Sequence, residues 1–377
     1  MNNFLSLTKN ISIVIPTMDR PDFMERTLHY YAKTGFKGRI LIGDSSSDVN
    51  FEKTANVKKS IDYDFDIIHK FIPRDEFNNS GLVIREVSKM IDTDYVCFSG
   101  DDDFLVPKTL GECVHFLNNN HDFSGAHGYR MTFKLNGDNV FYGTINSIQK
   151  VNEPCLQQEN ASKRFIEYMR NPISIQYYVF RRDIWKTAYN KISKTYTRYF
   201  GEEVLPCSIG AILGKYAQIN KLQTVFQIHN MHHFSWDLEG GGQNMLLLLT
   251  NKNFSITYHG LLDKIISELI KKEKIDHNIA YELVQKEIWN HLNRFMVGHY
   301  EDIYKEDSGD NRNNIIRKLK GIYRSFSLIK IYRYIINAIH SNELSLKKLK
   351  DPSHPFNDDF MLIFNHLKNK SDNLNLG

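Results

Sequence analysis

Short apolar runs alternate with amphipathic stretches over the first hundred residues of the chain. Four runs are rich in β-branched or aromatic residues, which is typical of buried strands: 11–15, 39–43, 65–72 and 95–98. After the first run, Met24, Leu28 and Tyr31 recur at helical spacing, and Gly35 stands where a helix would end. A second amphipathic helix is expected before the fourth run. This alternation predicts an α/β fold with a mostly parallel, Rossmann-like sheet flanked by helices.

The pattern continues less regularly beyond Pro107. It predicts helices at 109–118, 161–170 and 204–213, and strands at 123–134, 140–145, 174–180 and 222–228. Gly201, Glu202 and Glu203 open the third of these helices, where acids would favour the helix dipole. Strand signals vanish from about residue 252, and helical periodicity returns between 256 and 300. An all-helical C-terminal region is therefore expected after the sheet.

A basic amphipathic helix is predicted at 315–339. Its apolar face is surrounded by arginines and lysines without an acid, and the basic stretch begins at Arg312. Such a helix could lie on an anionic membrane surface, where each cation adds on the order of 1 kcal/mol. The alternative is a helix docked on the first domain with its cations in water. Peripheral membrane contact through 312–339 is therefore one of two interpretations.

Composition narrows the class of protein without deciding the function. Of the 377 residues, 41% are hydrophobic and 24% are charged, which is ordinary for a globular protein. The net charge of +4 is too small to indicate nucleic acid as a partner. No membrane-spanning run or signal peptide is recognised, so a cytoplasmic location is expected, at most associated with the inner face of a membrane. Four scattered cysteines suggest buried thiols in a reducing compartment: Cys97, Cys113, Cys155 and Cys207.

Polar clusters follow three of the four predicted strands. They lie at Pro16–Arg20, Asp44–Asp48 and Asp101–Asp103. In an open parallel sheet, ligands bind beyond the carboxyl ends of the strands, so these clusters are expected to share one edge. Three adjacent carboxylates repel each other unless a cation or hydrogen-bond donors lie among them. Mg2+ or Mn2+ would supply the charge, because both prefer oxygen ligands. A solvated acidic turn is the alternative.

Four sequence blocks, taken in order, resemble the nucleotide-sugar glycosyltransferases of the family 2 type, which have the GT-A fold. They are ISIVIPTMDRP at the first strand, GDSSSD after the second, TDYVCFSGDDD at the fourth, and Phe180 to Arg182 followed by GEEV. The resemblance covers about residues 10–235. It implies a glycosyltransferase domain at 1–250, with a nucleotide-binding half at about 1–106 and an acceptor half at about 107–250. A helical domain with a disordered tail would occupy 251–377.

The resemblance also assigns roles to residues. It implies that the nucleotide-sugar donor is bound by seven residues: Pro16, Thr17, Arg20, Asp44, Ser46, Arg85 and Asp101. Asp102 corresponds to the acid that coordinates Mn2+ or Mg2+, with Asp103 and His229 as further ligands. Glu203 corresponds to the catalytic base, although the family usually has Asp there, and Glu202 remains a rival. Gly100 stands where the family has the first acid of its metal motif.

The implied reaction is an inverting transfer of a sugar from a nucleoside diphosphate to a hydroxyl of a glycan or lipid-linked acceptor. The QxxRW signature of processive synthases is absent, which favours addition of a single sugar. Two alternatives remain at this point. One is a nucleotidyltransferase on a similar sheet, although the first loop lacks the glycine-rich, basic pattern expected of it. The other is a non-catalytic membrane-surface or assembly module that keeps the nucleotide-binding fold.

Overall fold

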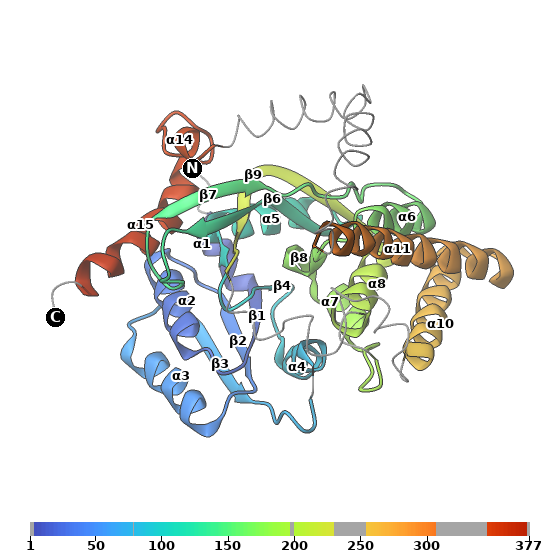
Figure 1. Ribbon diagram of the computed structural model, residues 1–377, viewed down its shortest axis with the longest axis horizontal. Coiled ribbons are helices and arrows are strands. Elements are labelled where there is room, and N and C mark those ends of the chain that lie inside the picture. The colour runs from blue at the N-terminus through green and yellow to red at the C-terminus, as the bar shows by residue number, and fades with distance from the viewer. Residues whose placement is uncertain (1–3, 78, 197–199, 230–253, 307–344, 375–377) are drawn as a thin grey trace.

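One nine-stranded sheet runs through the part of the chain that the structure describes (Figure 1). The structure is a computed structural model that describes residues 4–77, 79–196, 200–229, 254–306 and 345–374. The strand order is β3-β2-β1-β4-β8-β6-β9-β5, with β7 paired to β6. The predicted basic helix at 315–339 lies outside the described residues.

The first half of the sheet is parallel. Its strands are β1 (Ile11–Thr17), β2 (Arg39–Asp44), β3 (Asp66–Phe71) and β4 (Tyr95–Phe98). They are connected by helices α2 (Pro21–Lys33), α3 (Asp48–Ser60) and α4 (Ser80–Val87) and the short turn η2 (Ser88–Met90). The carboxyl ends of β1, β2 and β4 therefore meet at one edge, as the sequence predicts.

Antiparallel pairs extend the sheet beyond β4. The strands are β5 (Phe104–Leu105), β6 (Phe123–Leu135), β7 (Ile145–Lys150), β8 (Val179–Arg181) and β9 (Lys215–Gln227). Among the described strands of this half, β6 and β9 pair in parallel, and the other pairs are antiparallel. The helical elements are α5 (Pro107–Asn119), α6 (Ala161–Arg170), η3 (Ile175–Tyr177), α7 (Arg182–Tyr189), the π-helix η4 (Phe200–Val204) and α8 (Leu205–Leu213). The predicted α/β class with a sheet flanked by helices is confirmed, with a mixed rather than parallel second half.

Several predicted boundaries are wrong. Helix α3 was not predicted, because only Thr54 of its residues is buried and no apolar face marks it. The strand predicted at 140–145 instead begins at Ile145, and β9 begins at Lys215, before the predicted 222–228. Within the strand predicted at 174–180, residues Ile175–Tyr177 form a 3-10 turn. The helix predicted at 161–170 is confirmed.

The C-terminal helices pack at two separate places. Helices α10 (Phe254–Glu273) and α11 (His277–Glu306) pack on α6 and α8. Helix α15 (Asn357–Leu374), preceded by α14 (Leu346–Leu349), instead lies beside α2 (Figure 1). There His366 Nε2 lies 3.0 Å from the carbonyl oxygen of Arg26, and the Gly143 amide donates to the Leu367 carbonyl. The predicted domain boundary at 250 stays a prediction, since 230–253 are outside the described residues.

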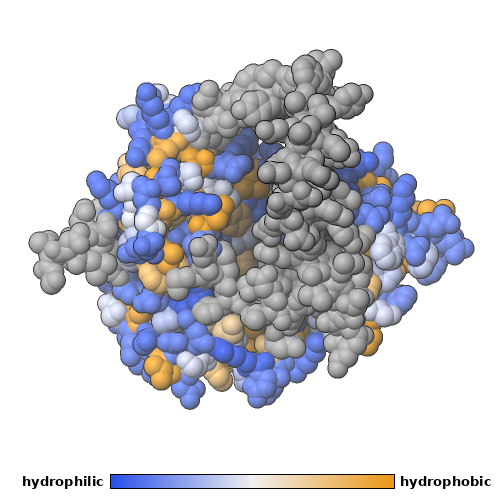
Figure 2. Space-filling model, in the orientation of Figure 1, coloured by the Kyte–Doolittle hydropathy of each residue, from blue (hydrophilic) through white to orange (hydrophobic). Residues whose placement is uncertain are grey.

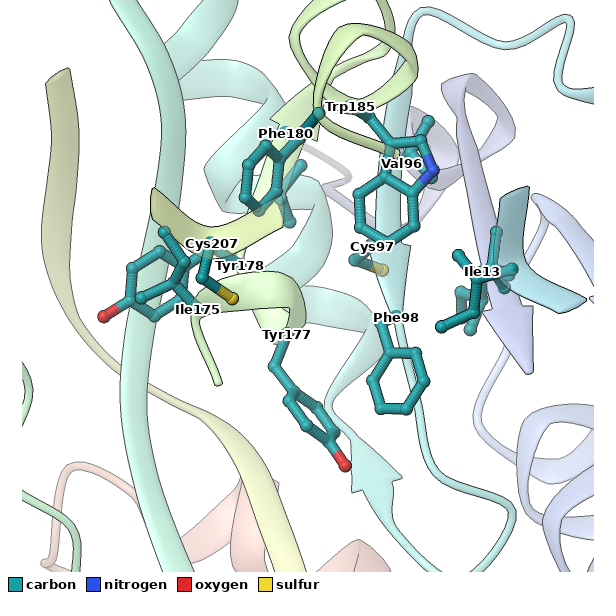
Figure 3. Packing of buried hydrophobic residues seen from close by; sticks show 14 of the residues in the cluster. Ile13, Val96, Cys97, Phe98, Ile175, Tyr177, Tyr178, Phe180, Trp185 and Cys207 are labelled. Carbon is teal, nitrogen blue, oxygen red and sulfur yellow. The ribbon is translucent and has the colours of Figure 1, made fainter. Parts of the chain in front are cut away.

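The buried hydrophobic residues form one continuous core. The close-up in Figure 3 shows Phe180 and Trp185 near Val96 of β4, and the Tyr177 ring beside that of Phe98. Cys97, Cys113 and Cys207 are buried, as predicted, whereas Cys155 is exposed. Over the described residues, the face in Figure 2 is mainly hydrophilic with scattered hydrophobic patches. No helix in the described ranges combines the length and apolarity that crossing a bilayer requires.

The N-terminus contributes two short elements, α1 (Phe4–Leu7) and η1 (Thr8–Asn10). Helix α1 packs on α5, and η1 leads directly into β1. Buried Thr8 ties these elements to the loop before β2, because the Lys37 amide donates to its hydroxyl at 3.0 Å. The start of β1, and with it the position of the loop after β1, is therefore anchored to the rest of the core.

Candidate active site at the carboxyl edge of the sheet

Strand pairing brings three of the predicted clusters together. Thr17 is aligned with Asp44 across β1 and β2, and Val14 with Phe98 across β1 and β4. The Ser99 amide donates to the Val14 carbonyl at 3.0 Å, which carries the β4 ladder one residue further. The loop after β4 therefore begins beside the end of β1.

Asp101 is held by residues from β1 and α2. The Thr17 hydroxyl donates to Asp101 Oδ2 at 2.6 Å, and the Thr27 hydroxyl donates to its backbone carbonyl at 2.7 Å. Arg20 Nη1 lies 2.7 Å from Asp101 Oδ1. Both carboxylate oxygens thus have a donor, although the side chain is almost completely buried.

Asp102 shares the same arginine. Arg20 Nη2 donates to Asp102 Oδ2 at 2.7 Å, and His229 Nε2 lies 2.9 Å from the same oxygen. The guanidinium of Arg20 lies 4.1 Å from the centre of the Phe23 ring, and this ring stacks on His229. Arg26 fixes the backbone by donating to the Asp102 carbonyl at 2.6 Å. One guanidinium therefore bridges two adjacent carboxylates.

Asp103 binds other partners. The Tyr177 hydroxyl donates to Asp103 Oδ2 at 2.5 Å, and the Gln227 amide donates to Oδ1 at 3.1 Å. A Cβ added to Gly100 would lie 2.6 Å from Asp103 Oδ2 and 2.8 Å from Asp102 Oδ1. Glycine at this position therefore leaves room for both carboxylates to fold back over the turn.

Burial alone would raise the pKa of all three carboxylates, but the net shifts differ in direction. It raises the pKa of Asp101 to about 7, with Arg20 opposing and the charge of Asp102 adding to the shift. Burial would also raise the pKa of Asp102, but His229 and Arg20 together hold it well below its usual range. Burial and the charge of Asp102 raise the pKa of Asp103 well above its usual value. Asp102 is therefore the carboxylate that stays ionised.

The loop after β2 is tied to the loop after β1. Asp44 accepts a hydrogen bond from the Ser46 amide at 2.9 Å, and its Oδ2 lies 2.8 Å from His69 Nε2. Asp19 has φ of 55°, a left-handed conformation that Asp tolerates better than most residues. Its amide donates to the Ser46 hydroxyl at 2.7 Å. Pro16 precedes these contacts in β1.

The Asp19 side chain also accepts hydrogen bonds from three residues. The Ser47 amide and hydroxyl, Asn50 Nδ2 and Arg74 Nη2 all donate to it. These donors lower the pKa of Asp19 against the opposing effect of burial. Asp19 thereby fixes the residue that precedes Arg20. Asp19 was not among the predicted site residues, although it lies in the polar cluster PTMDR, residues 16–20, which the sequence pattern singles out.

The two adjacent glutamates have different surroundings. Both oxygens of Glu202 accept from Ser80, one from the amide at 2.8 Å and one from the hydroxyl at 2.7 Å. Glu202 therefore caps the first turn of α4. Burial raises the pKa of Glu203, against a hydrogen bond from Ser174 and the charge of Arg130. Glu203 lies in the π-helix η4, a type of distortion that is frequent at functional sites.

A short segment links Glu203 to the acidic loop. Ser174 bonds Glu203, and Tyr177, three residues later, bonds Asp103. Arg130 donates to the Ser174 carbonyl at 2.8 Å and forms a buried ion pair with Glu153. Residues 174–177 therefore contact both predicted acidic sites. Arg85 is less central, because its Nη1 donates to the Ile192 carbonyl at 2.5 Å.

The arrangement does not fit a divalent ion as it stands. The described residues contain no group of three or more His, Cys, Asp or Glu side chains placed to hold a metal. Arg20 occupies oxygens of Asp101 and Asp102, while Tyr177 and a backbone amide occupy those of Asp103. The predicted roles of Asp102, Asp103 and His229 as metal ligands stay predictions.

Comparison with known proteins gives a similarity of fold. No family model and no curated protein matches this sequence. The chain is similar to the crystal structure of S. aureus TarS 1–349 in complex with UDP-GlcNAc, with 13% identity, a TM-score of 0.47, and 75% of this chain and 72% of that chain covered. It is also similar to glucosyl-3-phosphoglycerate synthase from Mycobacterium tuberculosis in complex with Mn2+, uridine diphosphate and phosphoglyceric acid. That match has 12% identity, a TM-score of 0.39, and 70% and 81% of the two chains covered.

Proposed function

We propose that this protein transfers a sugar from a nucleoside-diphosphate sugar to a hydroxyl group of a glycan or lipid-linked acceptor. The observation that supports this most is the convergence of Thr17, Arg20, Asp44 and Asp102 at one edge of the sheet. The carboxyl edge of a parallel sheet is where α/β proteins bind nucleotides. Arginine suits phosphate, because its planar fork can donate two parallel hydrogen bonds.

Glu203 is the proposed general base. The acceptor hydroxyl would lose its proton to Glu203 as its oxygen forms a bond to the anomeric carbon. The bond from that carbon to the diphosphate would break on the opposite side, so the configuration would invert. Burial raises the pKa of Glu203, which brings a carboxylate closer to the range in which it can act as a base. Glu202 is the weaker candidate, since both of its oxygens already accept from Ser80.

The leaving diphosphate requires positive charge near its oxygens. A bound Mn2+ or Mg2+ would neutralise that charge in the sequence-based hypothesis. The residues present do not fit such an ion while Arg20 bridges Asp101 and Asp102, so no step is assigned to it. Addition of one sugar per encounter also remains part of the proposal.

A thermal-shift screen against nucleotide sugars tests donor binding. A ligand at 100 times its dissociation constant adds roughly 2.7 kcal/mol to the folded state, which a melting curve resolves. Transfer is then followed as release of the nucleoside diphosphate from the donor so identified. Asp102→Asn should abolish most of this release, whereas Asp92→Asn, at the other end of the sheet, should leave it unchanged. Release of pyrophosphate from a nucleoside triphosphate would instead support a nucleotidyltransferase.

A further inference from the structure

We propose that Arg20 is the resident cation of the acidic loop and takes the place of a divalent ion there. The proposal rests on the proposed function for the identity of the ligand, a nucleoside diphosphate. Its physical basis is the bridge itself, in which Nη1 binds Asp101 and Nη2 binds Asp102, both at 2.7 Å. Arg20 therefore occupies Asp101 Oδ1 and Asp102 Oδ2, two of the oxygens that a metal joining these carboxylates could use.

The position of Arg20 is fixed by its surroundings. Its side chain is only 9% exposed, and its guanidinium lies over the Phe23 ring at 4.1 Å. Arg20 lies at the start of α2, directly after Asp19, whose side chain is held by hydrogen bonds. A guanidinium is not deprotonated in proteins, so Arg20 keeps its charge in this buried position. The guanidinium is thus a permanent positive charge beside the strand ends.

Arg20 also has hydrogen-bonding capacity to spare. A guanidinium carries five N–H donors. One on each terminal nitrogen binds the two carboxylates, and Nη2 also lies 3.3 Å from His229 Nε2. Its Nε is buried and has no hydrogen-bond partner in the described structure. An unpaired buried donor is costly, so an acceptor that arrives with a ligand would be favoured. Phosphate oxygens are acceptors of the matching charge and geometry.

This inference predicts two measurable properties. Wild-type protein should bind nucleoside diphosphate about equally well in EDTA and in Mn2+. It should also bind no Mn2+ at the acidic loop, because the guanidinium excludes the ion. Arg20→Gln keeps hydrogen-bond donors without the charge and should open a Mn2+ site on Asp101 and Asp102. Arg20→Lys keeps the charge and should not.

Electron paramagnetic resonance of Mn2+ without nucleotide tests exclusion of the ion directly. We expect no bound Mn2+ in wild type, and at least about tenfold tighter binding in Arg20→Gln, lost again when Asp102→Asn is added. Arg39→Gln is the matched control, because Arg39 also bridges two aspartates, Asp66 and Asp92. This control should show no gain. A stoichiometric Mn2+ site in wild type that Asp102→Asn removes would overturn the proposal, as would no gain in Arg20→Gln.

Calorimetry with UDP, GDP and ADP tests the second property. Wild-type affinity for the nucleotide that binds should change by less than about threefold between EDTA and Mn2+, and Arg20→Gln should weaken binding in EDTA by at least about tenfold. A requirement of the wild type for Mn2+ would overturn the proposal. If none of the nucleotides binds under either condition, the proposed function fails, while the resonance measurement still decides whether Arg20 excludes the ion.

Discussion

Two arginines bridge pairs of aspartates at opposite ends of the same parallel strands. Arg39 opens β2 and pairs with Asp66 and Asp92, whose side chains are 53% and 65% exposed. Arg20 follows β1 and pairs with Asp101 and Asp102, which are 4% and 10% exposed. An exposed ion pair costs little to form and contributes little. A buried one must overcome the desolvation of every charge in it.

We interpret the buried bridge at Arg20 as functional and the exposed bridge at Arg39 as structural. Replacing a buried ion pair by hydrophobic residues is often neutral or stabilising, so stability alone is weak evidence for keeping one. Around Arg20, hydrogen bonds from Thr17, Thr27 and Arg26 hold the acidic loop in place. Such a supporting network is what a binding site needs to keep its charges oriented. At the Arg39 bridge, Arg182 likewise donates to the Asp92 carbonyl at 2.9 Å, but the side chains of both aspartates are more than half exposed.

The largest expected difference between the two ends of the sheet is in turnover. Glu203→Gln should lower the rate of sugar transfer roughly 100-fold to 10,000-fold, because the general base is removed. Asp92→Asn, a matched loss of one carboxylate at the amino edge, should change the rate less than about twofold. The measurement is steady-state release of nucleoside diphosphate. Equal rates in Glu203→Gln and wild type would exclude Glu203 as the base.

The second largest difference is expected in the free energy of unfolding of variants at the two arginines. Arg20→Gln should lower the free energy of unfolding by about 3–5 kcal/mol, because Asp101 and Asp102 stay buried without their cation. Arg39→Gln should lower it by less than about 1 kcal/mol. Urea denaturation of the two variants measures both values. Similar losses would mean that burial does not distinguish the bridges.

The two bridges should also respond to pH with opposite signs. Burial raises the pKa of Asp101 to about 7, so the folded state binds a proton more strongly than the unfolded state. The corresponding stability is complete below about pH 4 and is lost as the pH rises toward 7. Asp101→Asn should reduce this slope, while Asp103, whose pKa burial also raises, keeps part of it. A slope as steep in Asp101→Asn as in wild type would contradict the contribution of Asp101.

Arg39 lowers the pKa of Asp92 through a hydrogen bond. The stability that this bond contributes is therefore present above about pH 4 and is lost as the pH falls below that value. Unfolding followed from pH 2 to 8 in Asp92→Asn and wild type isolates this contribution. A difference confined to neutral pH would contradict the assignment.

The smallest expected effect is in salt dependence. At 1 M salt the Debye length is about 3 Å, so exposed charges are screened far more than buried ones. The small cost of Arg39→Gln should therefore shrink further at high salt, while the cost of Arg20→Gln should persist. Repeating the urea titrations at low and high NaCl checks this. A salt-sensitive Arg20 bridge would indicate access of solvent to the acidic loop.

Features of the fold and the site that depend on residues close together in the sequence could be predicted, whereas contacts between residues far apart in the sequence could not. The strand ends, the acidic triplet and the first helix follow local patterns, and Pro21–Lys33 begins and ends as proline and glycine suggest. Helix α3 was not predicted, because it buries only Thr54 and therefore has no apolar periodicity in the sequence.

The contacts that decide the roles of the acids are not local. Tyr177 donates to Asp103 across 74 positions, and the Gln227 amide across 124. Arg20 itself was a candidate for the donor nucleotide, yet nothing in the sequence places its guanidinium between two aspartates 81 and 82 residues away. Pairings of that kind depend on how β1, β4 and β9 are ordered in the sheet, which residue types and spacing do not encode locally.

The most direct test of the account is a crystal structure with bound nucleoside diphosphate, grown in EDTA with the nucleotide that gives the largest thermal shift. We predict diphosphate oxygens within hydrogen-bond distance of Arg20, with Asp102 still paired to the guanidinium. Glu203 should face the side where the sugar would lie. A diphosphate bound elsewhere on the molecule would contradict it.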